Sequence, residues 1–148
     1  MSLVGNVYEG GPVRLEFTRT AAETGGQLHE MRATYEAGSP LPPAHRHPGQ
    51  DERFEVVAGA LTFLIDGERH TVAAGEAIDV PRGAVHQVHN PGEVPAVAVW
   101  QTRPALRTGE FHHELHAAVD AEDWARLGEV LGGYGDVFEL VTVPEREG

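Results

Sequence analysis

The distribution of turn-forming residues constrains the fold of this chain more than any other feature. Between residues 12 and 103, Gly, Pro and Asp recur at intervals of roughly eight to twelve residues and separate short apolar stretches. The clearest case is Asp66-Gly67, which lies between residues 60–65 and 70–72 and is typical of a two-residue β-hairpin turn. Many short strands joined by short turns indicate a β-sandwich or β-barrel rather than alternating strands and helices.

The other apolar stretches predict the remaining strands of this all-β core. They are residues 12–20, 27–36, 54–57, 77–80, 85–89 and 95–102. In residues 27–36, His29, Met31 and Tyr35 share one face, because alternate side chains of a strand point to the same side. These three side chains line the interior of the fold if this face points inward, and otherwise take part in ordinary packing.

The character of the sequence changes after residue 103. Thr108 is predicted to cap a helix over residues 110–119, and Asp120 a second helix over residues 121–131. An extended apolar pattern returns over residues 136–143. The sequence therefore predicts a short helical extension that follows the β-rich core.

The length of the chain fits a single domain. A chain of 148 residues can bury one hydrophobic core, here with the barrel over about residues 12–103 and the tail over about residues 108–148. The tail is too short for a separate domain. We expect it to pack on the outside of the barrel or across a dimer partner.

Two short clusters of metal-ligand residue types lie within residues 38–90. His45 and His47 are two residues apart, so on an extended segment both imidazoles leave the same face, and Glu52 follows closely enough to meet them. His86 ends a second extended segment. Imidazoles with one carboxylate suit a divalent first-row metal, and Fe, Mn, Ni, Zn and Cu are all chemically admissible.

These two clusters resemble the paired sequence motifs of the cupin superfamily. In the first motif, four residues separate His47 from Glu52 and six separate Glu52 from Gly59, while the spacer before His45 is one residue longer than the family usually has. Every fixed position of the second motif is matched, by Gly75, Pro81, Gly83, His86 and Asn90. The resemblance implies a double-stranded β-helix, that is, a jelly-roll or cupin barrel, which agrees with the strand pattern.

The resemblance also implies a metal site and a substrate pocket. Under it, His45, His47, Glu52 and His86 hold a divalent metal, for which Fe(II) is favoured and Mn, Ni and Zn are alternatives. Glu52 is in addition the candidate catalytic base. The candidate pocket residues are Tyr35, Gln50, Arg53, Phe54 and Gln101.

Three classes of function remain open for such a site. The first is an oxygen-dependent oxidoreductase, dioxygenase-like, acting on an aromatic or enolic small molecule. The second is a redox-neutral isomerase or lyase that uses Mn, Ni or Zn as a Lewis acid. The third is a non-catalytic protein that binds a metal or a small ligand. The fold alone does not decide among them, because one barrel supports many chemistries.

A second group of histidines lies in the tail. His112 and His116 are four residues apart and would share a helix face, which either holds a metal or is simply solvated, with His113 beside it. His70 and His89 are set aside, because His89 should point away from the side that His86 faces.

The composition of the chain limits the kinds of partner that it can bind. The chain has 11 Lys and Arg against 23 Asp and Glu, a formal charge of −12, which argues against nucleic acid and anionic membranes as partners. It has no Cys, so disulfides and thiol catalysis are excluded. The sequence shows neither a long apolar run nor a basic-then-apolar leader, so a cytoplasmic location is expected. A homodimer joined through sheet edges is also expected.

Overall fold

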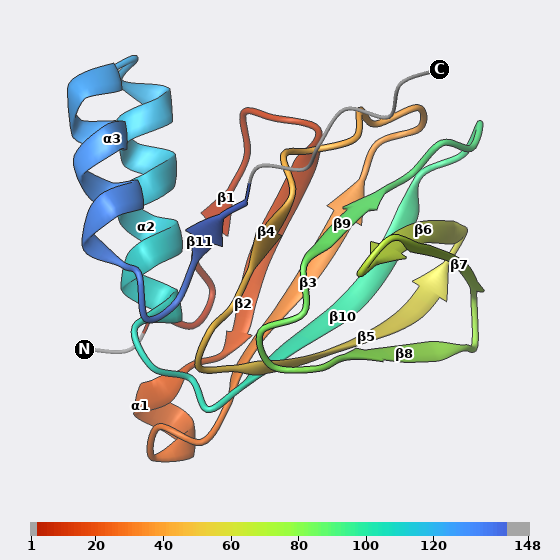
Figure 1. The fold of residues 1–148 in the computed structure, drawn as a ribbon, viewed down its shortest axis with the longest axis horizontal. Coiled ribbons are helices and arrows are strands. Elements are labelled where there is room, and N and C mark those ends of the chain that lie inside the picture. Colours follow the sequence, from red (N-terminus) through yellow and green to blue (C-terminus); the bar gives the residue numbers. More distant parts are fainter. Residues whose placement is uncertain (1–2, 142–148) are drawn as a thin grey trace.

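The structure, a computed structural model, describes residues 3–141. Two antiparallel sheets face each other and form a flattened barrel, with a helical pair at one side (Figure 1). One sheet has the order β1-β2-β3-β10-β5-β8 and the other the order β11-β4-β9-β6-β7. The strands are β1 Val7–Tyr8, β2 Val13–Arg19, β3 His29–Tyr35, β4 His45–Arg46, β5 Asp51–Ala58, β6 Ala60–Ile65, β7 Glu68–Ala73, β8 Ala77–Val80, β9 His86–His89, β10 Ala96–Arg103 and β11 Glu139–Leu140. The helices are α1 Ala21–Thr24, α2 Thr108–Asp120 and α3 Trp124–Gly133.

The predicted all-β jelly roll with a helical extension is therefore confirmed. Its hairpin around Asp66-Gly67 is also confirmed, since Ile65 lies opposite Glu68. Both turn residues have positive φ, 48° for Asp66 and 85° for Gly67, as a tight hairpin turn requires.

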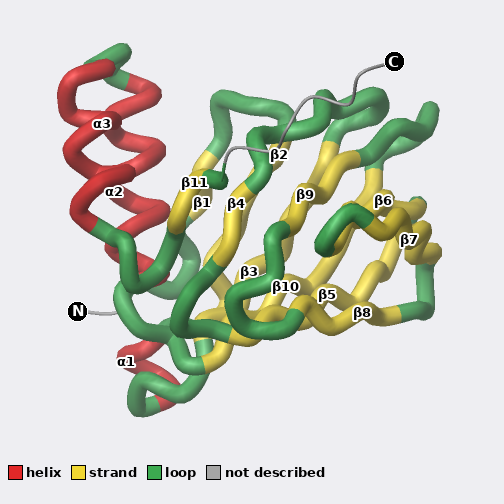
Figure 2. Tube along the Cα trace, viewed as in Figure 1, coloured by secondary structure: helices red, strands yellow, loops and turns green. Residues whose placement is uncertain are grey.

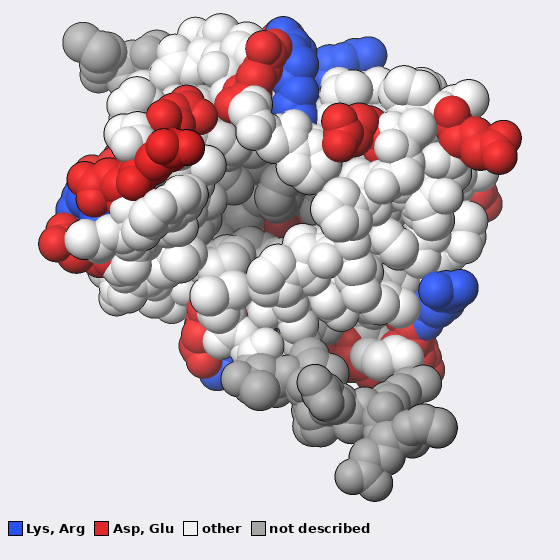
Figure 3. All heavy atoms as spheres, turned by 90° about the horizontal axis from the view of Figure 1, so that it is seen from above, with Lys and Arg blue, Asp and Glu red and all other residues white. Residues whose placement is uncertain are grey.

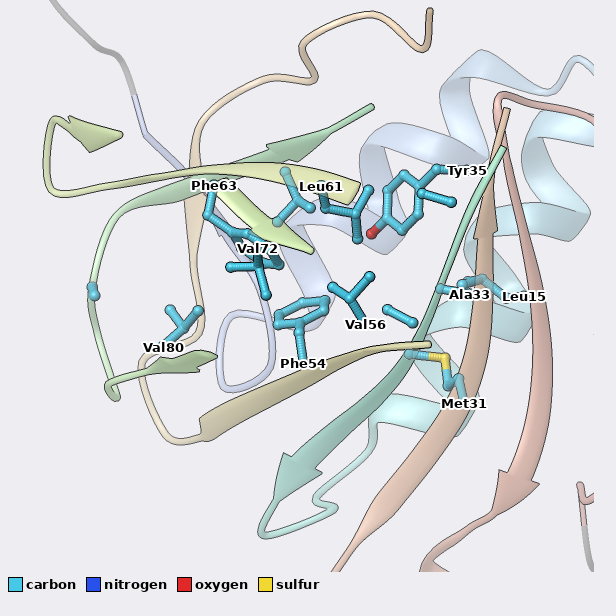
Figure 4. Close-up of a cluster of buried hydrophobic side chains, with 14 of the residues drawn as sticks. Leu15, Met31, Ala33, Tyr35, Phe54, Val56, Leu61, Phe63, Val72 and Val80 are labelled. Atoms are coloured by element: carbon cyan, nitrogen blue, oxygen red, sulfur yellow. The ribbon is translucent and has the colours of Figure 1, made fainter. Parts of the chain in front are cut away.

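The hydrophobic core lies between the two sheets. Strand β5 supplies Phe54 and Val56 from one sheet, and β6 supplies Leu61 and Phe63 from the other, all essentially inaccessible to solvent. Their side chains meet in the middle of the barrel (Figure 4). Strand β3 buries the face that carries His29, Met31 and Tyr35, which settles the open question of its orientation in favour of the interior.

Two details of the predicted helices are wrong. The second tail helix starts at Trp124, where Asp123 accepts a hydrogen bond from the Arg126 N–H at 3.0 Å, and Asp120 instead ends α2. Trp124 is 62% exposed, and Val130 is the buried residue of α3. In addition, Thr108 is the first residue of α2 and not its cap, because Arg107 occupies the N-cap position.

The tail joins the barrel instead of merely lying on its surface. Strand β11 pairs antiparallel with β4, so that Glu139 lies opposite Arg46 and Leu140 opposite His45. Helices α2 and α3 lie side by side next to this strand pair (Figure 2). Residues 142 and 143 of the predicted extended segment fall outside the described residues. Among residues 3–141, no helix combines the length and apolar character needed to cross a bilayer.

His29 makes the stability of the fold sensitive to acid. It is 1% exposed and packs against Phe17 with ring centroids 4.5 Å apart, and burial lowers its pKa to about 4. Between pH 6.5 and 4, His29 is therefore protonated in the unfolded chain but not in the folded protein. The free energy of unfolding consequently falls as the pH falls. We expect a loss of about 3 kcal/mol from this group by pH 4.

The comparison is between urea unfolding of the wild type and of a His29→Leu variant over this pH range. The variant lacks the titrating group, so its unfolding free energy should decline less steeply, by up to about 1.4 kcal/mol per pH unit. Equal slopes in the two proteins would show that His29 is protonated at similar pH in the folded and unfolded states.

Candidate metal centre

Three imidazoles from the five-stranded sheet and the loop beside it converge on one point. His45 belongs to β4 and lies opposite His86, the first residue of β9, while His47 follows β4 directly. One ligand atom from each of the three lies within 4.8 Å of those of the other two. His47 and His86 are buried and His45 is partly buried.

Each of these imidazoles is held through its Nδ1 atom by a backbone carbonyl. The acceptor is Pro43 O for His45 at 3.3 Å, Val137 O for His47 at 2.7 Å and Ala84 O for His86 at 2.9 Å. A carbonyl only accepts, so the proton of each neutral ring is on Nδ1. The Nε2 lone pairs are therefore free, which is the tautomer that Nε2 metal coordination needs.

Glu52 brings a carboxylate to the same point. Its Oε1 atom lies 3.0 Å from His47 Nε2 and 2.8 Å from His86 Nε2, while Trp100 Nε1 donates a hydrogen bond to Oε2. Within the described part of the chain, His47 Nε2, His86 Nε2 and Glu52 Oε1 are buried and have no hydrogen-bond partner. Three unpartnered lone-pair atoms at this separation repel one another unless a cation or a proton lies between them, so the donor set fits a metal ion.

The charges of these groups suit a cation. Burial would raise the pKa of the Glu52 carboxyl, but His47 and His86 outweigh it and hold that pKa below its usual range. Burial lowers the pKa of His45 to about 3, and His86 and His47 add to the effect. Burial also lowers the pKa of His47, but Glu52 and the hydrogen bond to the Val137 carbonyl together outweigh burial, so the pKa is raised overall. A proton on His47 and a metal ion would thus compete for one lone pair.

Two neighbouring cavities lie beside the three imidazoles. The outer cavity, about 270 Å³, has mostly apolar walls that include Val13, Leu15, Phe54, Val88 and Leu115. The inner cavity, about 120 Å³, lies against both His45 and His47. A hollow surrounded mainly by uncharged side chains, with acidic atoms visible in its depth, is seen in the space-filling view (Figure 3). Space for a small, largely apolar molecule therefore exists next to the candidate metal ligands.

The predicted pocket residues divide into two groups. Tyr35 and Phe54 line the outer cavity, and Gln50 lines the inner one. Arg53 and Gln101 line neither cavity. Arg53 is exposed and pairs with Asp79 at 3.2 Å, and Gln101 donates to Glu30 Oε2 at 2.7 Å.

Arg53 and Gln101 lie outside the cavities because alternate side chains of a strand point to opposite faces. Arg53 lies between the inward-facing Glu52 and Phe54, and Gln101 lies between Trp100 and Thr102. Successive side chains point to opposite faces, so both residues point away from the interior. The expectation that they orient a substrate is therefore corrected.

Further residues lie next to the site. Trp100 lines both cavities and stacks on Phe54 with ring centroids 5.1 Å apart, as expected for a wall supplied by the strand that ends the barrel. His112 lines both cavities and His116 the outer one, so their helix face is not simply solvated. His113 is exposed and hydrogen-bonds with the Tyr8 hydroxyl at 2.9 Å. Among described residues, the group whose ligand atoms all lie within 4.8 Å of one another consists of His45, His47 and His86, without the predicted fourth ligand Glu52.

The tail supplies a further contact to the metal site. Phe138 stacks on the His45 ring, with centroids 4.9 Å apart and an interplanar angle of 25°. Together with the Val137 carbonyl that accepts from His47, it links the end of the chain to two of the three imidazoles. Because about ninety residues separate these partners, no local sequence pattern reveals the link.

Comparison with known proteins gives matches along most of the chain. Residues 31–102 match the family model described as Cupin domain. The tetracenomycin polyketide synthase protein TcmJ of Streptomyces glaucescens is 35% identical over 69 residues, which cover 47% of this chain and 46% of TcmJ. The match thus spans less than half of the length of this relative. Protein SchB of Streptomyces halstedii is 29% identical over 119 residues, or 80% of each protein.

Solved structures agree in fold. An RmlC-like cupin from Shewanella frigidimarina superposes with a TM-score of 0.61 at 18% identity, covering 71% of this chain and 88% of that one. At this level of identity the likeness concerns the fold alone.

Proposed function

The chain is a small member of the cupin superfamily, and on that premise we propose that it is a metal-dependent enzyme which oxidises an aromatic or enolic small molecule with dioxygen. In this proposal His45, His47, Glu52 and His86 hold a divalent metal, with Fe(II) as the favoured ion. As a dioxygenase the enzyme would insert both oxygen atoms into the substrate and need no separate reductant.

The observation that carries the proposal is the convergence of unpartnered lone pairs. His47 Nε2, His86 Nε2 and Glu52 Oε1 meet at about 3 Å in a buried place, while the three Nδ1 atoms are taken by carbonyls. Buried polar atoms are normally hydrogen-bonded, and leaving one unpaired costs about 1–3 kcal/mol. A cation satisfies all of these atoms at once.

Several residues of the chain would have distinct roles around that ion. Trp100 holds Oε2 of Glu52, so Oε1 stays directed at His47 and His86. A bound divalent metal supplies a Lewis acid and, as iron, the redox partner that dioxygen chemistry requires. The four protein ligands would hold the ion without excluding a small molecule from it. The apolar outer cavity would exclude water and hold the carbon skeleton of the substrate.

A redox-neutral reaction on the same kind of substrate is the second candidate. The observation that favours it is the similarity to the tetracenomycin polyketide synthase protein TcmJ, because polyketide chemistry includes proton transfers on enolic carbon. The same four ligands would suit Mn, Ni or Zn as a Lewis acid that polarises a carbonyl group.

The test is reconstitution with one metal at a time. Metal-stripped protein is loaded with Fe(II), Mn(II), Ni(II) or Zn(II), and its metal content is measured by elemental analysis. Each form is then given 1,3-diketones, catechols and hydroxynaphthalenes, in air and under argon, with dioxygen uptake and product mass recorded.

The outcomes separate the classes. Dioxygen uptake by the Fe(II) form alone, with products heavier by two oxygen atoms, supports the oxidoreductase. Turnover under argon with Zn or Mn supports the redox-neutral enzyme instead. Stoichiometric metal binding without turnover on any substrate contradicts both and points to a binding protein, while failure of every metal to bind overturns the four-ligand site itself.

A further inference from the structure

Three buried polar atoms around the inner cavity have no partner in the described structure. They are Gln50 Oε1, Thr102 Oγ1 and His112 Nδ1. Gln50 and Thr102 are each 1% exposed and His112 is 9% exposed. All three residues line the same cavity of about 120 Å³, next to His45 and His47. A cavity bordered by several unpaired polar atoms is a place for a polar group or ordered water.

The orientation of Gln50 is fixed by its surroundings. Its Nε2 atom lies 2.9 Å from Pro104 O and 3.0 Å from Ala105 O, and carbonyl oxygens only accept, so the amide nitrogen must face them. The same nitrogen lies 2.7 Å from Thr108 Oγ1, at the start of α2. Oε1 is therefore left as an acceptor without a donor, and it requires a hydrogen from whatever occupies the cavity.

Thr102 and His112 complete a mixed set of donors and acceptors. A threonine hydroxyl donates and accepts, and the Nδ1 atom of a neutral imidazole does one or the other. His112 comes from α2, and its ring lies 5.7 Å, centroid to centroid, from that of Trp100. Because burial lowers the pKa of His112, with His29 and His116 adding to the effect, its ring is neutral near pH 7.

The two cavities share part of their lining. His45, Trp100, His112 and Leu115 border both, so the inner cavity lies directly beside the outer one. None of the described residues that line either cavity is Lys or Arg. An anionic end group would therefore meet the Gln50 acceptor with no lining cation from the chain to offset its charge.

We propose that the inner cavity is a subsite for the neutral hydroxyl of a phenol or enol, bound by Gln50, Thr102 and His112, with the apolar body of the molecule against Trp100. The hydroxyl donates to Gln50 Oε1 and accepts from Thr102 or His112, which satisfies atoms that a carboxylate or phosphate would leave unpaired. His112, which belongs to the helical tail and not to the barrel, is then a specificity-determining residue. This inference rests on the proposed function and narrows its substrate to uncharged hydroxyl compounds.

The test measures binding and needs no turnover. The zinc-loaded chain is used in a Trp124→Phe background, so that Trp100 is the only tryptophan and reports on the cavity; Trp124 itself is 62% exposed. The probes are 4-ethylphenol, ethylbenzene and 4-ethylbenzoate, which share one skeleton and differ in the end group. We expect 4-ethylphenol to quench Trp100 fluorescence with an affinity about tenfold higher than ethylbenzene, and 4-ethylbenzoate to bind more weakly than both.

Two variants then assign the preference to the subsite. In His112→Leu, and separately in the nearly isosteric Thr102→Val, the preference of 4-ethylphenol over ethylbenzene should shrink to about threefold or less while zinc content and melting temperature stay unchanged. A preference that persists in both variants would mean that the metal alone binds the hydroxyl, and the inference would be overturned. The inference would also be overturned if the Trp124→Phe protein bound 4-ethylphenol and ethylbenzene with equal affinity.

This design separates the inference from the proposed function. If the protein holds zinc but binds the three probes equally, the proposed hydroxyl subsite is contradicted and the proposed metal site is not. A hydroxyl preference that depends on His112 in a protein that binds no metal supports the subsite and contradicts the metal-dependent enzyme.

Discussion

A His86→Ala variant is expected to lose its bound metal and, with it, all metal-dependent turnover. His86 is 2% exposed, its Nδ1 atom is fixed by Ala84 O at 2.9 Å, and its Nε2 atom lies 2.8 Å from Glu52 Oε1. Loss of a group that only hydrogen-bonds to a metal ligand typically lowers metal affinity by about 10–100-fold. Removal of a ligand should therefore lower affinity by more than about 100-fold, measured by chelator competition and elemental analysis.

The same strand offers the matched control. His89 is the last residue of β9, and its side chain is only partly buried and points to the opposite face from His86 and Val88. A His89→Ala variant loses an imidazole from the same strand without touching the site, so it should keep the metal content of the wild type. If His86→Ala holds as much metal as His89→Ala, with both variants folded by circular dichroism, His86 is not a ligand.

Local patterns were sufficient to predict the centre of the site. His45 and His47 lie two residues apart around an extended segment, and Glu52 follows after one turn, so their meeting depends on only eight residues of chain. His86 is more distant in sequence, but strand pairing brings it opposite His45. The strands were predictable for a similar reason, since alternation and turn residues act over short distances.

The parts that were missed depend on tertiary register. Gln101 was expected in the pocket, but it follows Trp100 directly in β10, and in a strand a shift of one residue changes the face completely. The second tail helix begins three residues later than expected because Asp123 and not Asp120 caps it, and both are good capping residues. His112 drew attention only as a possible helical metal pair, because its burial beside Trp100 depends on how α2 packs on the barrel.

The feature that the sequence revealed least is the end of the chain, which contacts the candidate metal site directly. Phe138 packs between the rings of His45 and Phe111, at centroid distances of 4.9 and 5.1 Å, and both stacks have interplanar angles of 25°. The backbone carbonyl of its neighbour Val137 accepts a hydrogen bond from His47 Nδ1 at 2.7 Å. The tail thus belongs to the shell that orients two ligands, and a defect there should be felt at the metal.

A Phe138→Ala variant tests this coupling. Phe138 is only partly buried, so its truncation should lower the free energy of unfolding by about 2 kcal/mol, less than the 3–5 kcal/mol typical of fully buried Phe. Without the ring, His45 loses its stacking partner and metal affinity should fall by about tenfold. Leu140→Ala is the control, because Leu140 is in the same segment, opposite His45, but 49% exposed. If Phe138→Ala is destabilised but binds metal as tightly as Leu140→Ala, the tail supports the fold without tuning the site.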